Sequence, residues 1–525
     1  MRSVALSGFL GTGKTTLAPL VATALNLPWV DTDQMLAQRH GLSVAELWRS
    51  QGEAVFREGE EALVRELLGD GTPRVIALGG GAVTVRAVRH LLLDQAFLVT
   101  LTAPPADLLL RLGDLTLRPT LLARDPLARI ESLLAARADA YAECHLTVAT
   151  DRLSPDEAVQ AIVRGLKPGR VVVALGTRSY PVDVVREEPA ALTGHLARLA
   201  PSSVVVVSDA NVIATRGGAL LAALAGVGVP VSTVVLAPGE EHKTLRSVEQ
   251  IWNAALASID RDAVVLGFGG GVVGDLAGFA AATLLRGVRV VHSPTTLLAM
   301  VDASVGGKTG FDVPDGKNLL GAFHQPSAVV VDLAHLATLS RRDARCGLAE
   351  IAKIALACDQ ELWCELEASA EDLLESPAPL ARVVTRAIAL KAVVVRDDER
   401  EAGRRAVLNL GHTLGHALEA ASGYTALRHG EAVAMGLVAE CRAAEQLGGS
   451  PPGLADRVAA LLVRLGLPAV VDRTELARAW PLVAHDKKRR GQTVMLPVCE
   501  AVGACMPKAV PLDELARAMG LTALG

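Results

Sequence analysis

The sequence predicts an α/β protein with parallel sheets in its first two thirds and mainly helical structure in its last third. Up to about residue 332, runs rich in Val and Leu alternate with longer amphipathic stretches, a rhythm typical of strands joined by crossover helices. Beyond that point helical periodicity dominates, as in LARVVTRAIALKAVVV. The 525 residues also exceed what one hydrophobic core usually serves, so we expect about three domains.

The domain boundaries follow from a turn signal and from the change in periodicity. A turn-forming Pro168-Gly169 pair precedes the strand-like Val171-Val172-Val173, which indicates a restart of the fold. We therefore predict domains over residues 1–166, 170–332 and 333–525.

Composition and charge exclude several classes of protein. The net charge of −5, the pI near 6.2 and only 3% aromatic residues argue against a nucleic-acid partner. No apolar stretch is long enough to span a bilayer, and the first residues lack the pattern of a signal peptide, so we expect a cytoplasmic protein without membrane contact. The seven cysteines form no CxxC pair, which favours neither a disulfide framework nor a thiolate zinc site.

A phosphate-binding loop opens the chain. In VALSGFLGTGKTT, over residues 4–16, a short strand precedes Gly8, four further residues and then Gly13-Lys14-Thr15, the spacing of the P-loop. Glycines allow backbone N–H groups to surround phosphates, Lys14 reaches the β and γ oxygens, and the Thr15 hydroxyl can ligate Mg²⁺. The sequence therefore predicts a nucleotide site with ATP and Mg²⁺ as cofactors.

Further polar residues must identify the acceptor of the phosphoryl group. Asp31 and Asp33 follow a strand-like LPWV, where carboxylates can serve Mg²⁺ and a substrate hydroxyl or can simply cap a helix. The turn at Gly79-Gly80-Gly81 permits close approach of a small ligand or is only a tight turn. Each motif alone leaves both interpretations open.

Together, GFLGTGKTT, DTD, FREGE, ALGGG, LRPTL and RADAYAE resemble shikimate kinase over residues 1–166. The resemblance implies a P-loop fold of the nucleoside-monophosphate-kinase kind, and a lid that is short here. It implies ATP contacts from Gly11, Gly13, Lys14, Thr15, Thr16 and Arg111, Mg²⁺ contacts from Thr15 and Asp31, and shikimate contacts from Asp33, Arg57, Gly80 and Arg137. Lys14, Asp33 and the lid residue Arg118 receive catalytic roles. A gluconate or nucleotide kinase is the alternative, which a set of guanidinium groups for a small carboxylate disfavours.

A second glycine-rich turn lies in AVVLGFGGGVVGD, over residues 263–275. Gly269, Gly271 and Gly274 satisfy GxGxxG, but the acidic residue expected about 20 positions later is absent. The motif alone is therefore weak support for a dinucleotide site.

A candidate metal centre lies in the last third of the chain. Glu350 is in LAEIAK, His412 and His416 are an i,i+4 pair in GHTLGH, and His429 begins HGE. Spacing alone does not decide whether both paired histidines bind zinc or one contacts substrate. Lys353 lies one turn after Glu350, where a plain ion pair is the simpler interpretation.

The motifs DANV, PGEEHKT, PTTLLAMVDASVGGKTG and GKN, with the residues above, resemble 3-dehydroquinate synthase over residues 170–525. The resemblance implies a Rossmann-like NAD domain and a helical metal domain, with Glu350, His412 and His429 binding Zn²⁺ or Co²⁺. It implies NAD contacts from Asp209, Asn211, Glu240, Lys243, Gly271, Asp275, Thr295, Thr296, Lys308 and Lys317. Catalytic roles fall to Lys308, Lys353, Arg405 and His416, and substrate contacts to Arg286, Asp302, Asn318, Lys391, Asn409 and Lys487, for which Lys488 is an alternative. Because Arg286 would reach a neighbouring subunit, a homodimer through this half is also implied.

The implied reaction converts 3-deoxy-D-arabino-heptulosonate 7-phosphate to 3-dehydroquinate and phosphate, with NAD reduced and reoxidised in each turnover. A polyol dehydrogenase that releases NADH is disfavoured by the phosphate-binding set Lys308, Lys317, Asn318, Lys391 and Arg405. A related sugar-phosphate cyclase is disfavoured less firmly. A non-catalytic regulatory module in either half is the alternative of a different class.

Overall fold

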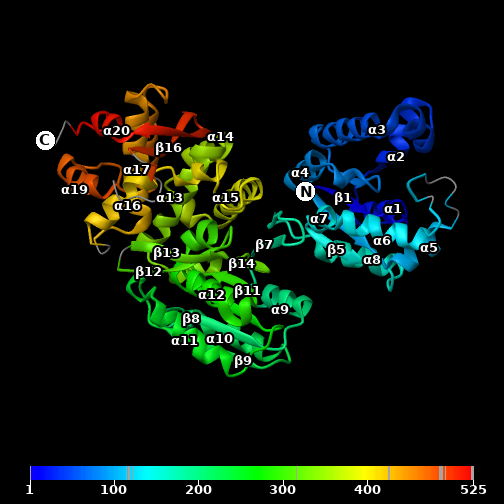
Figure 1. The fold of residues 1–525 in the computed structure, drawn as a ribbon, viewed down its shortest axis with the longest axis horizontal. Coiled ribbons are helices and arrows are strands. Elements are labelled where there is room, and N and C mark those ends of the chain that lie inside the picture. The colour runs from blue at the N-terminus through cyan, green and yellow to red at the C-terminus, as the bar shows by residue number, and fades with distance from the viewer. Residues whose placement is uncertain are drawn as a thin grey trace. The chain divides into compact units, whose positions relative to one another are not determined.

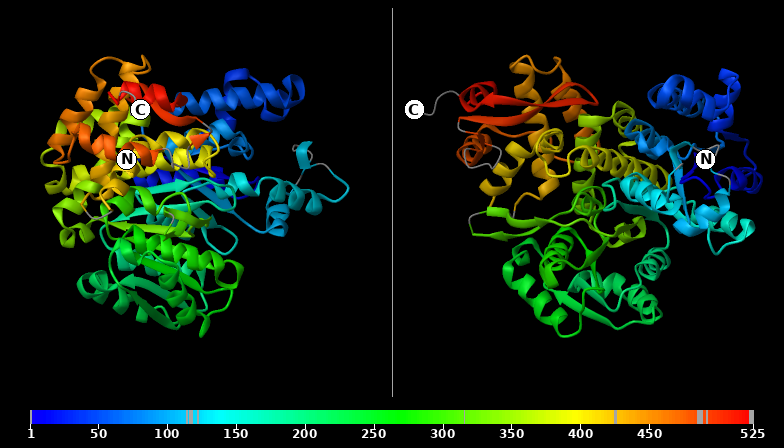
Figure 2. Two further views of the ribbon diagram at one scale, coloured as in Figure 1. Left: turned by 60° about the vertical axis from the view of Figure 1, so that its left-hand side comes forward. Right: turned by 45° about the vertical axis from the view of Figure 1, so that its right-hand side comes forward.

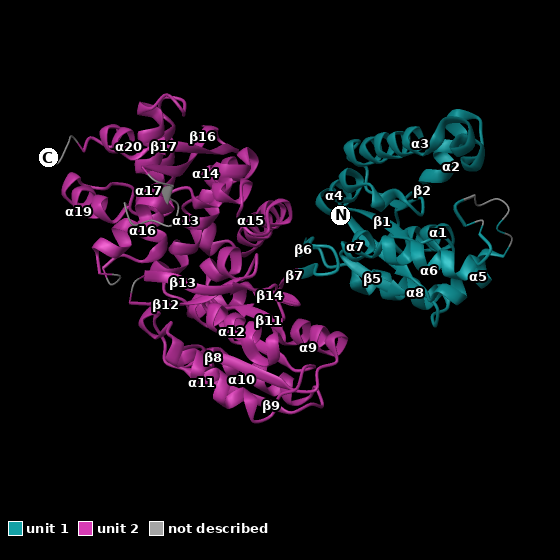
Figure 3. Cartoon of the chain, viewed as in Figure 1, with its two compact units in different colours: residues 1–181 teal, residues 182–525 magenta. Residues whose placement is uncertain are grey.

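The structure is a computed structural model in which two compact units, residues 1–181 and 182–525, are distinguished (Figure 3). It describes residues 2–113, 115, 119–121, 123–314, 316–423, 426–483, 489–490 and 492–521. Within these ranges, no helix combines the length and the apolar character needed to cross a membrane.

The first unit is built on a parallel sheet of five strands in the order β2-β3-β1-β4-β5. Its strands are β1 (Ser3–Gly8), β2 (Trp29–Asp31), β3 (Val75–Ala77), β4 (Ala96–Thr102) and β5 (Leu146–Ala149). Its helices are α1 (Lys14–Leu25), α2 (Thr32–His40), α3 (Val44–Gly69), α4 (Arg86–Gln95), α5 (Pro105–Leu112), α6 (Pro126–Ala136), α7 (Ala138–Ala142) and α8 (Pro155–Gly165) (Figure 1).

Two cores cover the two faces of this sheet, which explains why its strands are apolar at successive positions. Every residue of β1 is buried, and neighbouring residues point to opposite faces. Val4 and Leu6 pack in the core that includes Leu17 of α1, whereas Ala5 packs in the core that includes Leu63 of α3. Strand β6 (Arg170–Val173) follows, and Ala174 after it is buried in the second of these cores.

The second unit contains a parallel sheet in the order β7-β14-β11-β10-β8-β9. Its strands are β7 (Tyr180–Val185), β8 (Val204–Asp209), β9 (Val231–Leu236), β10 (Val264–Gly269), β11 (Arg289–Pro294) and β14 (Ala328–Asp332). Helices α9 (Glu188–Leu199), α10 (Ala210–Ala225), α11 (Leu245–Leu256) and α12 (Gly271–Thr283) belong to this α/β part. From β8 the chain goes outward to β9 and then back to β10, so the strand order reverses between β8 and β10. Ligands of open α/β sheets bind beyond the carboxyl ends of the strands at such a point.

The rest of the second unit is mainly helical, and Figure 2 shows it gathered at the end opposite to the α/β part. Its helices are α13 (Arg341–Cys358), α14 (Gln360–Ser369), α15 (Pro377–Asp397), α16 (His412–Ala421), α17 (His429–Gln446), α18 (Leu454–Arg464), α19 (Arg473–Val483) and α20 (Leu512–Ala518). A hairpin of β12 (Lys308–Val313) and β13 (Gly316–Phe323) precedes it, and β15 (Arg489–Arg490), β16 (Thr493–Ala501) and β17 (Ala504–Pro511) form a small antiparallel sheet. Periodicity did not predict this last sheet, because Pro497 and Pro507 interrupt both long strands where they face each other.

Two glycines let the helices of this part approach each other closely. A Cβ atom on Gly436 of α17 would lie 2.0 Å from the backbone oxygen of Gly411, which precedes α16. A Cβ atom on Gly430 of α17 would lie 2.4 Å from the Cα atom of Cys346 in α13. Backbone contact at these positions brings together α13, α16 and α17, the helices that carry Glu350, His412 and His429.

Candidate active sites

The phosphate-binding loop of the first unit joins β1 to α1, as the sequence predicts. Gly8 has a φ of 134°, and a Cβ atom there would lie 2.3 Å from the backbone oxygen of Leu101 on the neighbouring strand. Lys14 is buried at the start of α1, and its Nζ atom donates to the carbonyls of Gly8 at 2.9 Å and Phe9 at 3.0 Å. The lysine therefore lies inside the loop, next to the helix N-terminus where phosphate groups bind.

Asp31 caps α2 and also contacts a residue of the phosphate-binding loop. Its Oδ1 atom accepts hydrogen bonds from the backbone N–H groups of Asp33 at 3.0 Å and Gln34 at 3.2 Å, so it caps α2. Its Oδ2 atom accepts a bond of 2.8 Å from the hydroxyl of Thr15. The two predicted Mg²⁺ contacts are thus hydrogen-bonded to each other beside the loop.

Four residues predicted to contact shikimate converge on the glycine turn after β3. The carbonyl oxygen of Gly80 accepts from Nη1 of Arg137 at 3.4 Å. A Cβ atom on Gly81 would lie 2.1 Å from Nη2 of Arg57, and one on Gly79 would lie 2.6 Å from Oδ1 of Asp33. Two guanidinium groups and one carboxylate therefore surround this glycine backbone, and a Cβ atom at Gly79 or Gly81 would displace neighbouring side chains.

Glu60 and Tyr141 also belong to this site, and sequence reasoning did not assign them. The fully buried carboxylate of Glu60 pairs with Nη1 of Arg57 at 2.6 Å, while the Tyr141 hydroxyl donates to the Gly80 carbonyl at 2.7 Å. Burial raises the pKa of Glu60 to about 7, although the charge of Arg57 opposes this shift. Their spacing in the sequence could have indicated them, because Glu60 lies one helical turn after Arg57 and Tyr141 lies one turn after Arg137.

The remaining residues predicted for the kinase lie around the loop. Gly11 and Gly13 have positive φ angles of 82° and 95°, and Thr16 lies in the first turn of α1. Nη2 of Arg111 on α5 donates to the carbonyl of Thr150 at 2.9 Å. Arg118, predicted for the lid, lies outside the described residues.

The second unit contains a large cavity of about 2610 Å³ between its α/β and helical parts. Most residues predicted for the synthase line it, namely Asp209, Asn211, Glu240, Lys243, Gly271, Asp275, Thr295, Thr296, Asp302, Lys308, Lys317, Asn318, Lys353, Lys391, Arg405, Asn409, His412, His416 and His429. Glu350 is buried immediately behind the histidines. Arg286 is not among the described residues that line the cavity, and Lys487 and Lys488 lie outside the described part of the chain.

One end of the cavity lies at the strand-order reversal between β8 and β10. Asp209 ends β8 and caps α10, with Oδ1 accepting from the backbone N–H of Asn211 at 2.9 Å. Gly271 begins α12 directly after β10, so two helix N-termini face this end and favour the pyrophosphate of a dinucleotide. Nearby, Nζ of Lys243 contacts Oδ2 of Asp275 at 2.5 Å.

The metal-binding candidates converge as three side chains from three helices. One ligand atom from each of Glu350, His412 and His429 lies within 4.8 Å of the others. Oε1 of Glu350 lies 3.6 Å from Nε2 of His412 and 3.4 Å from Nε2 of His429. Neither oxygen of Glu350 accepts a well-aligned hydrogen bond within the described part of the chain, although Lys353 forms an ion pair with Oε2. One carboxylate and two imidazoles suit a divalent cation such as Zn²⁺ or Co²⁺.

The electrostatics of the cluster also favour a cation. Burial alone would lower the pKa of His429, but the hydrogen bonds and charges of Glu350 and Glu419 outweigh it and raise the pKa to about 9. His416 lies beside the three ligands, with its ring centroid 5.2 Å from that of His412. Its ring is as close to His412 as that of His429 is, at 5.3 Å, but among the described residues the group whose ligand atoms lie within 4.8 Å of one another is Glu350, His412 and His429.

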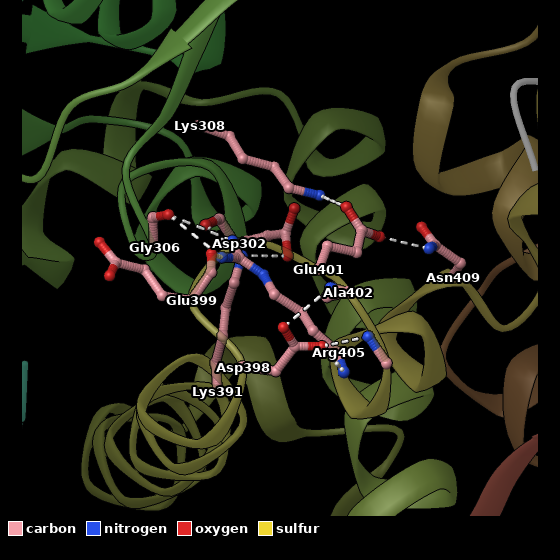
Figure 4. A network of polar contacts seen from close by, with 11 residues as sticks. Asp302, Gly306, Lys308, Lys391, Asp398, Glu399, Glu401, Ala402, Arg405 and Asn409 are labelled. Atoms are coloured by element: carbon pink, nitrogen blue, oxygen red, sulfur yellow. Dashed lines mark hydrogen bonds and ion pairs between the residues drawn. The ribbon is translucent and has the colours of Figure 1, made fainter.

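A network of charged groups lies next to the metal-binding cluster (Figure 4). Nζ of Lys391, on α15, donates to Oδ1 of Asp302 at 2.5 Å, and Arg405 donates to the carbonyl of Gly306. Lys308 forms an ion pair with Glu401. Burial lowers the pKa of Lys391 to about 8, with Asp302 opposing the shift. These cations suit a phosphorylated, carboxylated substrate.

Glu401 was not predicted from the sequence, where it is one of several acidic residues in DDERE. Its Oε1 atom accepts from Nδ2 of Asn409 at 2.5 Å, so the carboxylate lies between Asn409 and Lys308. Its φ of 58° is unusual for a residue with a side chain.

Comparison with known proteins agrees with these two sites. Models of the N-terminal and C-terminal parts of 3-dehydroquinate synthase match residues 233–346 and 347–489. The 3-dehydroquinate synthase of Caulobacter vibrioides is 44% identical over an alignment of 348 residues, and the match covers 63% of this chain and 93% of the relative. This chain belongs to the 3-dehydroquinate synthase family. The enzyme of that name from Pelobacter propionicus is 41% identical, over 67% of this chain and 99% of the relative.

The part of the chain that these synthases leave uncovered has its own match. A shikimate kinase model matches residues 10–167. The chain therefore joins a shikimate kinase to a 3-dehydroquinate synthase and is a bifunctional enzyme of the shikimate pathway.

Solved structures resemble the synthase part. ValA, a 2-epi-5-epi-valiolone synthase from Streptomyces hygroscopicus subsp. jinggangensis 5008 with NAD⁺ and Zn²⁺ bound, is 31% identical with a TM-score of 0.59 and covers 65% of this chain and 95% of that one. A 2-deoxy-scyllo-inosose synthase, 23% identical with a TM-score of 0.61, covers 67% and 99% and shares the fold.

Proposed function

We propose that the first unit phosphorylates shikimate through the residues gathered at the loop and the glycine turn. Arg57 approaches the turn from α3 and Arg137 from the junction between α6 and α7, so together they can hold the shikimate carboxylate in a fixed orientation. Asp33, beside Gly79, accepts a hydrogen bond from the hydroxyl that attacks the γ-phosphate. Lys14 exchanges its two loop carbonyls for phosphate oxygens when ATP binds, with Arg118 completing the set.

Mg²⁺ would be held by Thr15 and Asp31, which are already hydrogen-bonded to each other, and would neutralise charge on the phosphates. Gly11, Gly13 and Thr16 contribute backbone and hydroxyl contacts to ATP, and Arg111 lies beside the adenine.

For the synthase, the cavity supports separate positions for cofactor, metal and substrate. We propose that NAD occupies the end between β8 and β10, where Asp209, Asn211, Glu240, Lys243, Gly271, Asp275, Thr295, Thr296 and Lys317 contact it. Glu350, His412 and His429 would hold Zn²⁺ or Co²⁺. When bound, NAD supplies reversible oxidation of a ring alcohol and the metal polarises that alcohol.

The charged network then holds the substrate. Lys308, Arg405 and Lys391 bind its phosphate and carboxylate, while Asp302, Asn318, Asn409 and one of Lys487 and Lys488 orient its hydroxyls. Lys353 and His416 lie next to the metal ligands and donate hydrogen bonds to the reacting oxygens. The observation that carries this assignment is the convergence of Glu350, His412 and His429 beside the buried cations Lys353, Lys391 and Arg405 in one cavity.

We further propose a cytoplasmic homodimer through the synthase half. Leu319, Leu320 and Phe323 of β13 are exposed apolar side chains, and a second copy would bury them. Arg286 does not line the cavity of its own chain, which fits a role in the partner's phosphate site. Sedimentation should give a dimer, and Leu320→Glu with Phe323→Glu should give a monomer that is less active as a synthase.

The test of function is phosphate release from the heptulosonate phosphate with substoichiometric NAD and Zn²⁺, while NADH absorbance is followed. Many metal-dependent turnovers per NAD without accumulated NADH are expected, whereas stoichiometric NADH would indicate a dehydrogenase. ADP formation that requires shikimate tests the kinase in the same sample. Proteolysis followed by activity assays tests the proposed domains 1–166, 170–332 and 333–525.

A further inference from the structure

Glu419 connects two parts of the synthase site that have separate proposed ligands. It lies on α16, and its side chain is only 6% exposed. Its Oε2 atom is 3.3 Å from Nδ1 of His429, a proposed metal ligand, and its Oε1 atom is 2.7 Å from Nζ of Lys317, a proposed NAD contact on β13. One buried carboxylate therefore touches a residue of the metal site and a residue of the cofactor site.

The two metal-binding histidines are held in different ways. Nδ1 of His412 lies 3.1 Å from the carbonyl of Leu410, whereas Nδ1 of His429 faces the Glu419 carboxylate. Both partners only accept hydrogen bonds, so each Nδ1 carries a hydrogen and each Nε2 is directed toward Glu350. The partner of His412 is backbone two residues away. The partner of His429 is the side chain of Glu419, so the position of this carboxylate depends on its other contacts.

The second contact of the Glu419 carboxylate is Lys317. Its Nζ atom contacts Oε1 of Glu419 at 2.7 Å and Oε1 of Glu240 at 3.3 Å, and Glu240 is another proposed NAD contact. The chain of contacts Glu240, Lys317, Glu419, His429, Glu350 thus runs from the α/β part to α13. A ligand that fixes Lys317 also fixes the carboxylate that orients His429.

We propose that Glu419 is a positioning residue that couples NAD binding to metal binding in the synthase half. This inference rests on the proposed cofactor and metal sites. Bound NAD fixes Lys317, Lys317 holds Glu419, and Glu419 aligns Nε2 of His429 with Glu350. By thermodynamic reciprocity, the metal strengthens NAD binding by the same factor.

The test uses the full-length chain stripped of metal with a chelator and titrated with Co²⁺ against a competing indicator, with and without NAD. For the unchanged chain, NAD should lower the Kd of Co²⁺ by about fivefold or more. Glu419→Gln should raise the Kd of Co²⁺ by roughly 10- to 100-fold, and NAD should no longer change it.

Lys317→Gln is the matched variant, because it breaks the link while leaving the contact between Glu419 and His429. At an NAD concentration that a separate NAD titration shows to saturate this variant, NAD should no longer lower its Kd for Co²⁺. This variant also carries the test if Glu419→Gln does not fold. Circular dichroism and kinase turnover of the same sample control for folding and for the amount of chain.

The inference is overturned if Glu419→Gln binds Co²⁺ with an unchanged Kd, or if Lys317→Gln keeps the full effect of NAD. Failure of the proposed function is a different result, in which the unchanged chain binds neither Co²⁺ nor Zn²⁺. That result would overturn the metal site and this inference together.

Discussion

The two active sites of this chain are constructed in different ways. The kinase site is built mostly from backbone, because the loop after β1 and the turn after β3 lie side by side at the ends of neighbouring strands. The metal-binding part of the synthase site is built from side chains on α13, α16 and α17, and α13 is separated from the other two helices by α14 and α15. Short motifs therefore specify the first site almost completely, whereas the second depends on how helices pack.

The largest expected effect is the loss of one activity while the other stays unchanged. Lys14→Ala should lower shikimate kinase turnover by about 1,000-fold, because the buried ammonium group is replaced at the point where phosphate charge develops. Phosphate release by the synthase should not change. Both rates are measured on one preparation, with the exposed Lys508→Ala as control, and a kinase that kept a tenth of its activity would contradict the assignment.

The converse variant is His429→Ala in the synthase. Removing one of three metal ligands should lower synthase turnover by about 100-fold or more and should reduce bound Zn²⁺, which elemental analysis measures. Kinase activity should remain at the level of the unchanged chain. Full metal content together with normal phosphate release would show that His429 is not a ligand.

Substitutions of close-packed glycines test the difference between the kinase site, which depends on backbone turns, and the synthase site, which depends on helix packing. Gly436→Ala places a Cβ atom 2.0 Å from the backbone oxygen of Gly411, so α16 and α17 must separate, at a cost of about 1–3 kcal/mol. Calorimetry should show a lower Tm for the second unit, with reduced synthase activity. Gly194→Ala on α9 is the control, since an added Cβ there meets open space, and an equal loss of stability would refute the packing argument.

In the kinase the corresponding substitution should affect binding more than stability. Gly81→Ala brings a Cβ atom within 2.1 Å of Nη2 of Arg57, the end of a flexible side chain, which can move away. The KM for shikimate should rise about tenfold while the KM for ATP is unchanged, because only the carboxylate contact is displaced. Gly69→Ala, which also meets open space, should leave both constants unchanged.

The smallest effect concerns pH and Glu60. Burial raises its pKa from the ordinary value of 4.5 to about 7, so the folded first unit binds this proton more tightly than the unfolded chain. The corresponding stability is fully present below about pH 4.5 and is lost as pH rises to about 7. Glu60→Gln should flatten the dependence of the first calorimetric transition over this range, and an unaltered slope would contradict the shift.

Much of the fold and of both sites could be predicted from the sequence. The P-loop spacing identifies Lys14 and Thr15, and the alternation of apolar runs with helices predicts the two parallel sheets. Glu60, Glu401 and Glu419 were not identified, because a carboxylate on a helix or in a loop is usually solvated. Only packing reveals that Glu60 is fully buried, that Glu401 meets Lys308 and that Glu419 meets His429.

The sequence by itself determined the loops, strands and helices, because these depend on residues that are neighbours along the chain. A glycine loop between a strand and a helix forms wherever its residues stand in order, and period and composition decide which segments become strands or helices. Tertiary structure alone decided that His412 and His429 converge on Glu350 while His416 lies beside them. The reason is physical, because these distances depend on the backbone contacts of Gly430 with α13 and of Gly436 with Gly411, which the periodicity of a single helix does not specify.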